Sequence, residues 1–262
     1  GQLRPRERMK SLKVLLIALL ITLAALASLL WLAPAELALR WFGDRLGAIR
    51  LQGVSGSVWQ GRAEQLVAFD VALGPLLWTV DRSSALQGNP RGRLQLAGSE
   101  VRASGDFVRS GAALRLSNLS ANVPAALLAP ALDIPALGLV GRIDLQASAA
   151  ELRDGLLYSA QGRAEWRDLG VTGAASVRLP GVAIDFAPAA DGAILAEVAD
   201  LGGPLAIAGE VRLKDGHFVS ETRLNLRQPD PQIEEALKFI GQRTADGGSF
   251  LRVEGQLHEI PQ

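Results

Sequence analysis

Few residues in this sequence are of the types that most often perform chemistry. It contains no cysteine and two histidines, His217 and His258, which lie far apart. Disulfides, thiolate metal sites, cysteine nucleophiles and a histidine-rich metal centre are therefore excluded. Gly-x-Ser-x-Gly, Walker-type and dinucleotide-binding patterns do not occur. We predict no catalytic residue, no cofactor and no metal, and therefore a protein that acts by contact.

The charged residues are balanced and lie close to one another. Lysine plus arginine and aspartate plus glutamate both number 27, so the formal charge is zero and a nucleic-acid partner is not expected. Carboxylates often neighbour an arginine, as in Asp81-Arg82 and Arg167-Asp168. We interpret these as solvated pairs on strand edges and turns, where charge also discourages aggregation.

An uncharged apolar segment stands near the start of the chain at Val14–Ala33. As a helix it would span roughly 30 Å, the thickness of the hydrocarbon core of a bilayer. The flank before it is cationic and the flank after it is balanced, which predicts a cytoplasmic N-terminus and transfer of the rest across the membrane. The orienting cations are Arg4, Arg6, Arg8, Lys10 and Lys13. A bilayer is thus an expected partner.

A cleaved signal peptide is the alternative interpretation of this segment. Ala33-Pro34-Ala35 has the small-x-small form of a cleavage site. The apolar run, however, is longer than the ~7–15 residues of a signal core, which favours an uncleaved anchor. We divide the chain into a basic tail at 1–13, a transmembrane helix at 14–33, a connecting helix or linker at 34–50, and a β-rich domain at 51–262, as one unit or two subdomains.

Short segments of alternating polarity follow Trp41. Residues 217–227 and 251–258 alternate apolar and polar side chains with period two, as does 177–186 on either side of a turn signal at Pro180-Gly181. Several such segments at short spacing favour antiparallel β structure. We predict a mainly β fold with a curved or meandering antiparallel sheet, half-barrel or sandwich-like, and a few short helices.

Helices are predicted at three places in the chain. Pro34–Leu46 continues or follows the membrane helix. Val123–Leu132 forms a short apolar helix or a lid between strands. Pro231–Arg243 is an amphipathic helix with Asp230 as its N-cap. The last of these is expected to cover one end of the sheet. Arg82–Pro90 and Ala187–Gly192 are expected to be linkers.

The most distinctive motif is Gly56-Ser57-Val58-Trp59-Gln60-Gly61-Arg62-Ala63. Glycines allow close backbone approach, and we expect Trp59, like Trp166, to plug the end of a β core rather than to form a ligand platform. With the single N-terminal membrane segment, the β-rich body and a late helix before Gly247-Gly248-Ser249-Phe250-Leu251, the motif resembles protein N of the bacterial type II secretion system. Gly56, Val58, Trp59, Gly61 and Arg62 match it in a structural role.

The resemblance implies a single-pass inner-membrane protein of Gram-negative bacteria with a periplasmic β domain. It implies an accessory, non-enzymatic role in protein secretion, with the inner-membrane platform as partner and the secretin as a further candidate. An AsmA-like protein that binds or transfers lipid in an apolar groove is the alternative. An open groove lined by Val, Leu, Ile and Phe would favour lipid, whereas a groove filled by Trp59, Trp166 and helices would favour a packed core.

Overall fold

The computed structural model describes residues 34–36, 49–68, 70–128, 138–172, 177–237, 242–244 and 247–256. The predicted membrane helix at 14–33, its basic flank and His258 lie outside these ranges, as does all but the start of the helix expected over Pro34–Leu46. In the described part of the chain, no helix combines the length and the apolar character needed to cross a membrane.

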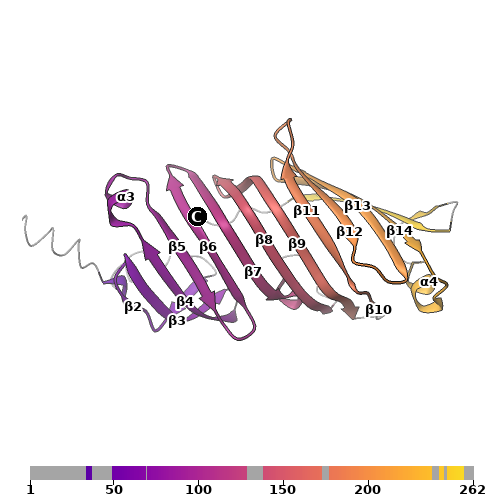
Figure 1. The fold of residues 1–262 in the computed structure, drawn as a ribbon, viewed down its shortest axis with the longest axis horizontal. Helices are drawn as coiled ribbons and strands as arrows, with labels where there is room; N and C mark the ends of the chain where they lie inside the picture. Colours follow the sequence, from indigo (N-terminus) through magenta and orange to yellow (C-terminus); the bar gives the residue numbers. More distant parts are fainter. Residues whose placement is uncertain are drawn as a thin grey trace, which may run out of the picture.

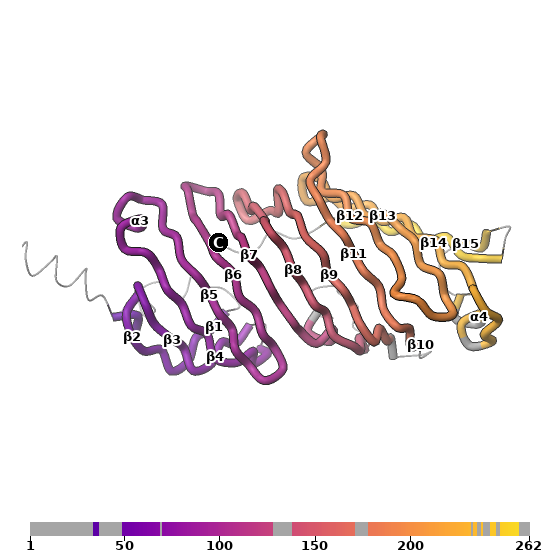
Figure 2. Tube along the Cα trace, in the orientation of Figure 1, coloured from indigo at the N-terminus to yellow at the C-terminus, as the bar shows by residue number. Residues whose placement is uncertain are grey.

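The strands form one sheet of 16 strands, with neighbours antiparallel throughout. They lie side by side along the long axis of the molecule, with β2–β4 at one end and β14 at the other (Figures 1 and 2). The strands are β1 (Ile49–Gln52), β2 (Ser55–Gly56), β3 (Gln60–Ala68), β4 (Val71–Val80), β5 (Arg91–Ala97), β6 (Arg102–Ser110), β7 (Ala113–Pro124), β8 (Gly138–Arg153), β9 (Leu156–Thr172), β10 (Val177–Arg178), β11 (Gly181–Pro188), β12 (Ile194–Asp200), β13 (Leu205–Lys214), β14 (His217–Leu226), β15 (Gln242–Arg243) and β16 (Ser249–Gln256).

Chain order and sheet order agree for almost every strand. The exceptions are short: β1 and β2 both pair with β3, β10 and β11 both pair with β9, and β15 lies outside β16. The predicted antiparallel meander is therefore confirmed. The described strands build one open sheet, so the two packed layers of a sandwich are not formed.

Tight turns between the strands explain why the sheet meanders. Asp154-Gly155 joins β8 to β9 and Asp215-Gly216 joins β13 to β14. All four residues have positive φ, between 50° and 80°. An Asp-Gly pair in this conformation matches the twist of a two-residue hairpin, so each pair reverses the chain locally and sets the next strand antiparallel.

The two faces of the sheet differ in polarity. Residues directly opposite each other in an antiparallel pair share a face, so the registers divide the side chains into two sets. One set is rich in Arg, Asp, Glu, Gln and Ser and is called the polar face here. The other, called the apolar face, includes Leu76, Trp78, Leu96, Phe107, Leu119, Leu145, Trp166, Ile184, Val198, Ile207 and Leu224.

A compact core forms where the helix α4 (Pro231–Leu237) packs against the apolar face. Ile233 and Leu237 of α4 are each 5% exposed and join Val182, Leu205, Ile207 and Leu224. The Asp230 carboxylate accepts a 3.3 Å hydrogen bond from the backbone N–H of Ile233, which confirms the expected cap. Helix formation is confirmed over 231–237, whereas Gln242–Arg243 is the strand β15.

Two segments differ from their predicted structure. Arg82–Pro90 was predicted as a linker, but the helix α3 (Arg82–Leu86) forms there because Asp81 caps it with a 3.0 Å bond from the N–H of Ser83. The helix predicted over Val123–Leu132 is also wrong at its start: β7 runs to Pro124, and a 3₁₀ turn, η2 (Ala125–Leu128), follows. Val123 is β-branched and favours a strand, and pairing with β8 continues through Val123 and Pro124, so the helical turn can begin only after them.

The expected turn at Pro180-Gly181 is wrong as well. β10 and β11 pair with the same strand, β9, and the register of Arg178 with Gly170 continues unchanged to Gly181 with Arg167. The N–H of Asp168 donates to the Pro180 carbonyl (2.9 Å), so the ladder passes straight through. Proline interrupts the strand pattern here without reversing the chain, because its carbonyl still accepts a ladder bond.

Candidate interaction surfaces

The motif around Trp59 forms the turn that joins β2 to β3. Gly56 lies opposite Gly61, and the N–H of Ser57 donates to the Gln60 carbonyl at 2.9 Å. Ser57 also forms an isolated antiparallel bridge with Pro34. The chain that follows the predicted membrane segment is thus tied to this turn, at the first edge of the sheet.

Gly56 and Gly61 are required at these positions by space and conformation. Gly56 has φ of 89°, and a Cβ there would lie 2.7 Å from the Gln60 carbonyl oxygen. A Cβ at Gly61 would lie 2.3 Å from Cζ2 of Trp78. The backbones of β2 and β3 and the Trp78 ring therefore approach so closely that a residue larger than glycine does not fit at either position. The resemblance-based expectation of a structural role for these glycines stays a prediction, but this geometry supports it.

The tryptophans expected as core plugs occupy different settings. Trp59 is half-buried in the turn, and its carbonyl accepts a 2.6 Å bond from the N–H of Val80. Trp166 is half-buried against the α4 core and donates its indole N–H to the Val140 carbonyl at 2.9 Å. Val58 is half-buried beside Trp59, and Arg62 is exposed on the polar face. Sequence reasoning missed Trp78, whose alternation with Leu76 and Val80 was the available signal.

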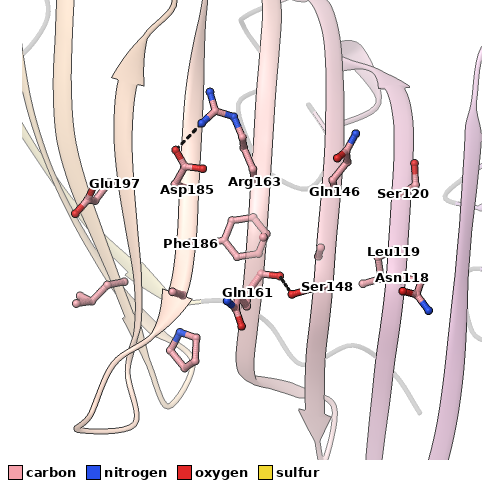
Figure 3. A pocket seen from close by; sticks show the side chains of 15 residues that line it. Asn118, Leu119, Ser120, Gln146, Ser148, Gln161, Arg163, Asp185, Phe186 and Glu197 are labelled. Carbon is pink, nitrogen blue, oxygen red and sulfur yellow. Dashed lines mark hydrogen bonds and ion pairs between the residues drawn. The ribbon is translucent and has the colours of Figure 1, made fainter.

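One row of side chains crosses the whole polar face. Each of its members lies directly opposite the next on the neighbouring strand, and Figure 3 shows the stretch from Ser120 to Glu197. We call this set the polar row: Arg62, Leu77, Gln95, Ser104, Ser120, Gln146, Arg163, Asp185, Glu197, Glu210, Glu221 and Arg252. Leu77 interrupts the row near its first end, and from Gln95 to Arg252 every member carries a side chain that can form hydrogen bonds.

The middle of the polar face is hollowed where the sheet is irregular. Asn118 of β7 and Ser148 of β8 lie at register shifts on opposite strands, and Asn118 has a positive φ of 51°. The hollow has a volume of about 900 Å³ and spans β7 to β12. Its lining includes the polar row from Ser120 to Glu197, together with Gln161 and Leu195 (Figure 3). The lining also includes Leu119, Phe186 and Pro188, so polar and apolar groups lie side by side in the hollow.

Ion pairs stiffen the strands beside this hollow. Arg163 donates to Glu165 (2.9 Å) and to Asp185 (2.7 Å), and Arg167 donates to Glu165 (2.7 Å) and lies 3.7 Å from Asp144. The hydrogen bond from Arg167 and then that from Arg163 lower the pKa of the Glu165 carboxyl. Exposed pairs of this kind stabilise little individually, but together they fix the side chains of three strands.

The polar row becomes acidic toward the last strands. Asp185, Glu197, Glu210 and Glu221 lie opposite one another in succession on β11 to β14. Arg163 pairs with the first at 2.7 Å and Arg252 with the last at 2.8 Å. Like charges directly opposite each other in a sheet are unfavourable, so a cationic partner would relieve the repulsion between Glu197 and Glu210.

The histidine of the described sequence lies apart from these groups. His217 is exposed at the start of β14, with a ring nitrogen 2.9 Å from Nε2 of Gln256. Among the described residues, no cluster of His, Asp or Glu could hold a metal ion. The described strands thus present one open sheet with a polar face, and with an apolar face that α4 covers in part.

Comparison with known families gives this architecture a context. Residues 47–252 match the model of the family described as type II secretion system (T2SS), protein N, and the chain belongs to that family. The protein is therefore a non-catalytic component of the type II secretion machinery of the Gram-negative envelope, and it serves protein transport. No curated protein and no solved structure gave a match.

Proposed function

We propose that the chain is an accessory subunit held in the inner membrane by residues 14–33, with its β domain in the periplasm. The family match over 47–252 carries the assignment to secretion. The uncharged segment with a cationic flank supports the anchor and its orientation. The partners we propose are the inner-membrane platform proteins and the secretin.

The polar face is the surface that we propose for these contacts. It presents the hollow over β7 to β12 and the acidic end of the polar row, and Glu197 and Glu210 are exposed. Interfaces of transient assemblies are polar and wet, and complementary charge sets their register. A partner segment carrying lysine or arginine fits this surface.

Crosslinking in intact cells tests the proposed contact. The chain has no cysteine, so E210C introduces a single thiol on the polar face. V211C is the control, because it introduces a single thiol at the adjacent position, which lies on the apolar face. A short thiol-to-amine crosslinker should join E210C, and not V211C, to a platform protein or the secretin. Adducts free of secretion proteins, or equal yields from both variants, would count against the contact.

The anchor is tested separately by a topology reporter. Alkaline phosphatase fused after Gln262 is active only outside the cytoplasm, and the proposal expects an active fusion that stays with the membrane fraction. An inactive fusion, or a protein released from membranes without detergent, would contradict the anchored arrangement and leave the family assignment intact.

Lipid handling is a second candidate because the apolar face is covered unevenly. Under α4, Val182, Ile207 and Leu224 are at most 8% exposed, whereas Leu94 of β5 is 42% exposed. Between these extremes, Leu96, Phe107, Leu119 and Leu145 remain half-buried. Apolar side chains left partly open along a sheet can receive acyl chains, since their burial is favourable at roughly 25 cal/mol per Å².

Phospholipid copurification distinguishes the two functions. L94E and Q95E add the same charge at neighbouring positions that face opposite sides of the sheet. If the face binds lipid, the detergent-purified wild-type chain retains stoichiometric phospholipid, L94E loses it and Q95E keeps it. Absence of phospholipid from the wild type, or equal retention by both variants, would reject the lipid candidate.

A further inference from the structure

The last strand, β16, has an open and regular outer edge. Its inner edge pairs with β14 over eight consecutive positions without a register shift. On the outer side, β15 reaches only Phe250 and Ser249. Within the described ranges, residues 251–256 therefore have no strand beyond them, and they contain no proline. An unprotected edge of this length is a template for another strand.

Side chains alternate along this edge in a self-complementary order. Leu251, Val253 and Gly255 lie on the apolar face, and Arg252 and Glu254 lie on the polar face. Val253 is 41% exposed, although its side chain lies on the apolar face and in the middle of the open segment. Arg252 and Glu254 therefore place one positive and one negative charge on either side of the exposed Val253.

We propose that β16 pairs antiparallel with β16 of a second copy of this chain, about a two-fold axis at Val253. Opposite residues must share a face, so only registers centred on a residue are allowed. Centring on Val253 sets Arg252 against Glu254 twice. Centring on Glu254 or Arg252 would set like charges against each other. Because β15 already pairs with Phe250, the register centred on Val253 can pair residues 251–255 of each copy, whereas centring on Arg252 would leave only 251–253 free to pair.

The proposed register also fits the apolar face. It brings Leu251 opposite Gly255 of the other copy, and the Phe218 ring lies over Gly255, close enough that a Cβ there would be 2.6 Å from it. Leu251 would therefore meet an aromatic ring rather than empty space. Pairing makes the apolar and polar faces continuous through both copies. The inference rests on the edge alone and does not depend on the secretion role.

Disulfide trapping tests the pairing in the full-length chain in membranes. V253C supplies a single thiol that faces its symmetry mate, where opposite Cβ atoms lie about 5 Å apart. L94C is the matched control, because Leu94 is 42% exposed on the same face but lies mid-sheet. Mild oxidation should dimerise most of V253C and little of L94C. Equal trapping, or V253C adducts to another protein, would overturn the proposal.

Charge reversal tests the register. In the V253C background, R252E or E254R should lower the yield of dimer by about threefold or more, since each places like charges opposite twice. The double variant R252E/E254R restores opposite charges and should recover the yield. Thermal unfolding of the variants separates a loss of pairing from a loss of fold. This register would be refuted if the single reversals left the dimer yield unchanged. It would also be refuted if the double variant folded but did not recover the yield.

Discussion

The indole N–H of Trp78 donates a 3.1 Å hydrogen bond to the carbonyl oxygen of Ser57. This bond ties β4 to the turn of the family motif. Ser57 in turn bridges Pro34, so one contact chain runs from the end of the predicted membrane segment to the interior of the first strands. The turn therefore contacts the residue that directly follows the proposed anchor in the sequence.

Replacing Gly61 by alanine should destabilise this end of the sheet. The new Cβ would lie 2.3 Å from Cζ2 of Trp78 and 2.8 Å from the Ser55 carbonyl oxygen, so ring and backbone must both shift. We expect a loss of about 1–3 kcal/mol in the free energy of unfolding, measured by urea titration. Q95A, at an exposed position, is the control and should match the wild type. An unchanged midpoint for G61A would show that Trp78 moves without cost.

Asp200 should make stability depend on pH. Its carboxylate accepts hydrogen bonds from Arg227 (2.7 and 3.0 Å) and from the N–H groups of Gly202 (2.9 Å) and Ile207 (3.0 Å). The bond from Arg227 is the largest cause that lowers the pKa of Asp200 from 3.8 to about 2. Because the folded-state pKa is depressed, the stabilisation is complete above about pH 4 and is lost as the pH falls toward 2.

The variant D200A tests that contribution. At pH 7 it should lower the free energy of unfolding by about 2 kcal/mol, since Arg227 and two backbone donors lose their acceptor. The difference between variant and wild type should shrink at pH 3 and nearly vanish near pH 2. E210A removes an exposed carboxylate from the middle of β13 and serves as a comparison for charge. A constant difference across this range would exclude titration of Asp200 as the cause.

The two ends of the apolar face should respond differently to truncation. L237A removes a side chain that is 5% exposed in the α4 core, and we expect a loss of about 3 kcal/mol. L94A removes one that is 42% exposed, and we expect a loss of about 1 kcal/mol or less. Chemical denaturation of both variants provides the measurement. Equal losses would indicate that the apolar face is packed equally along its length.

Glu165 should contribute a salt-sensitive part of the stability. It accepts hydrogen bonds from both Arg163 and Arg167, so E165Q leaves two guanidinium groups close together without the anion between them. We expect a small decrease in the melting temperature that shrinks as sodium chloride is added, because salt screens exposed charges. E197Q, which changes an exposed carboxylate in the hollow beside these ion pairs, is the control and should not lower the melting temperature.

Local patterns in the sequence were enough to predict several of the strands and the start of the last helix. Period-two alternation marks β14 and β16, and Asp230 with the apolar spacing of Ile233 and Leu237 marks α4, because each signal depends on neighbours in the chain. The motif and the late helix also pointed to the family. The prediction of a turn at Pro180-Gly181 was wrong because the Pro180 carbonyl still accepts a hydrogen bond from β9. That pairing partner cannot be identified from the residues near Pro180 in the sequence.

The sequence alone therefore determined the mainly β character of the fold, several of its strands and the resemblance to the family. The tertiary structure decided which strands are neighbours and in what register, since these depend on pairings between residues far apart in the chain. Register alone lines up Arg163, Asp185 and Glu197 across three strands, and it sets Trp78 over Gly61. It also leaves Val253 on an open edge, because whether a strand is an edge depends on the whole sheet.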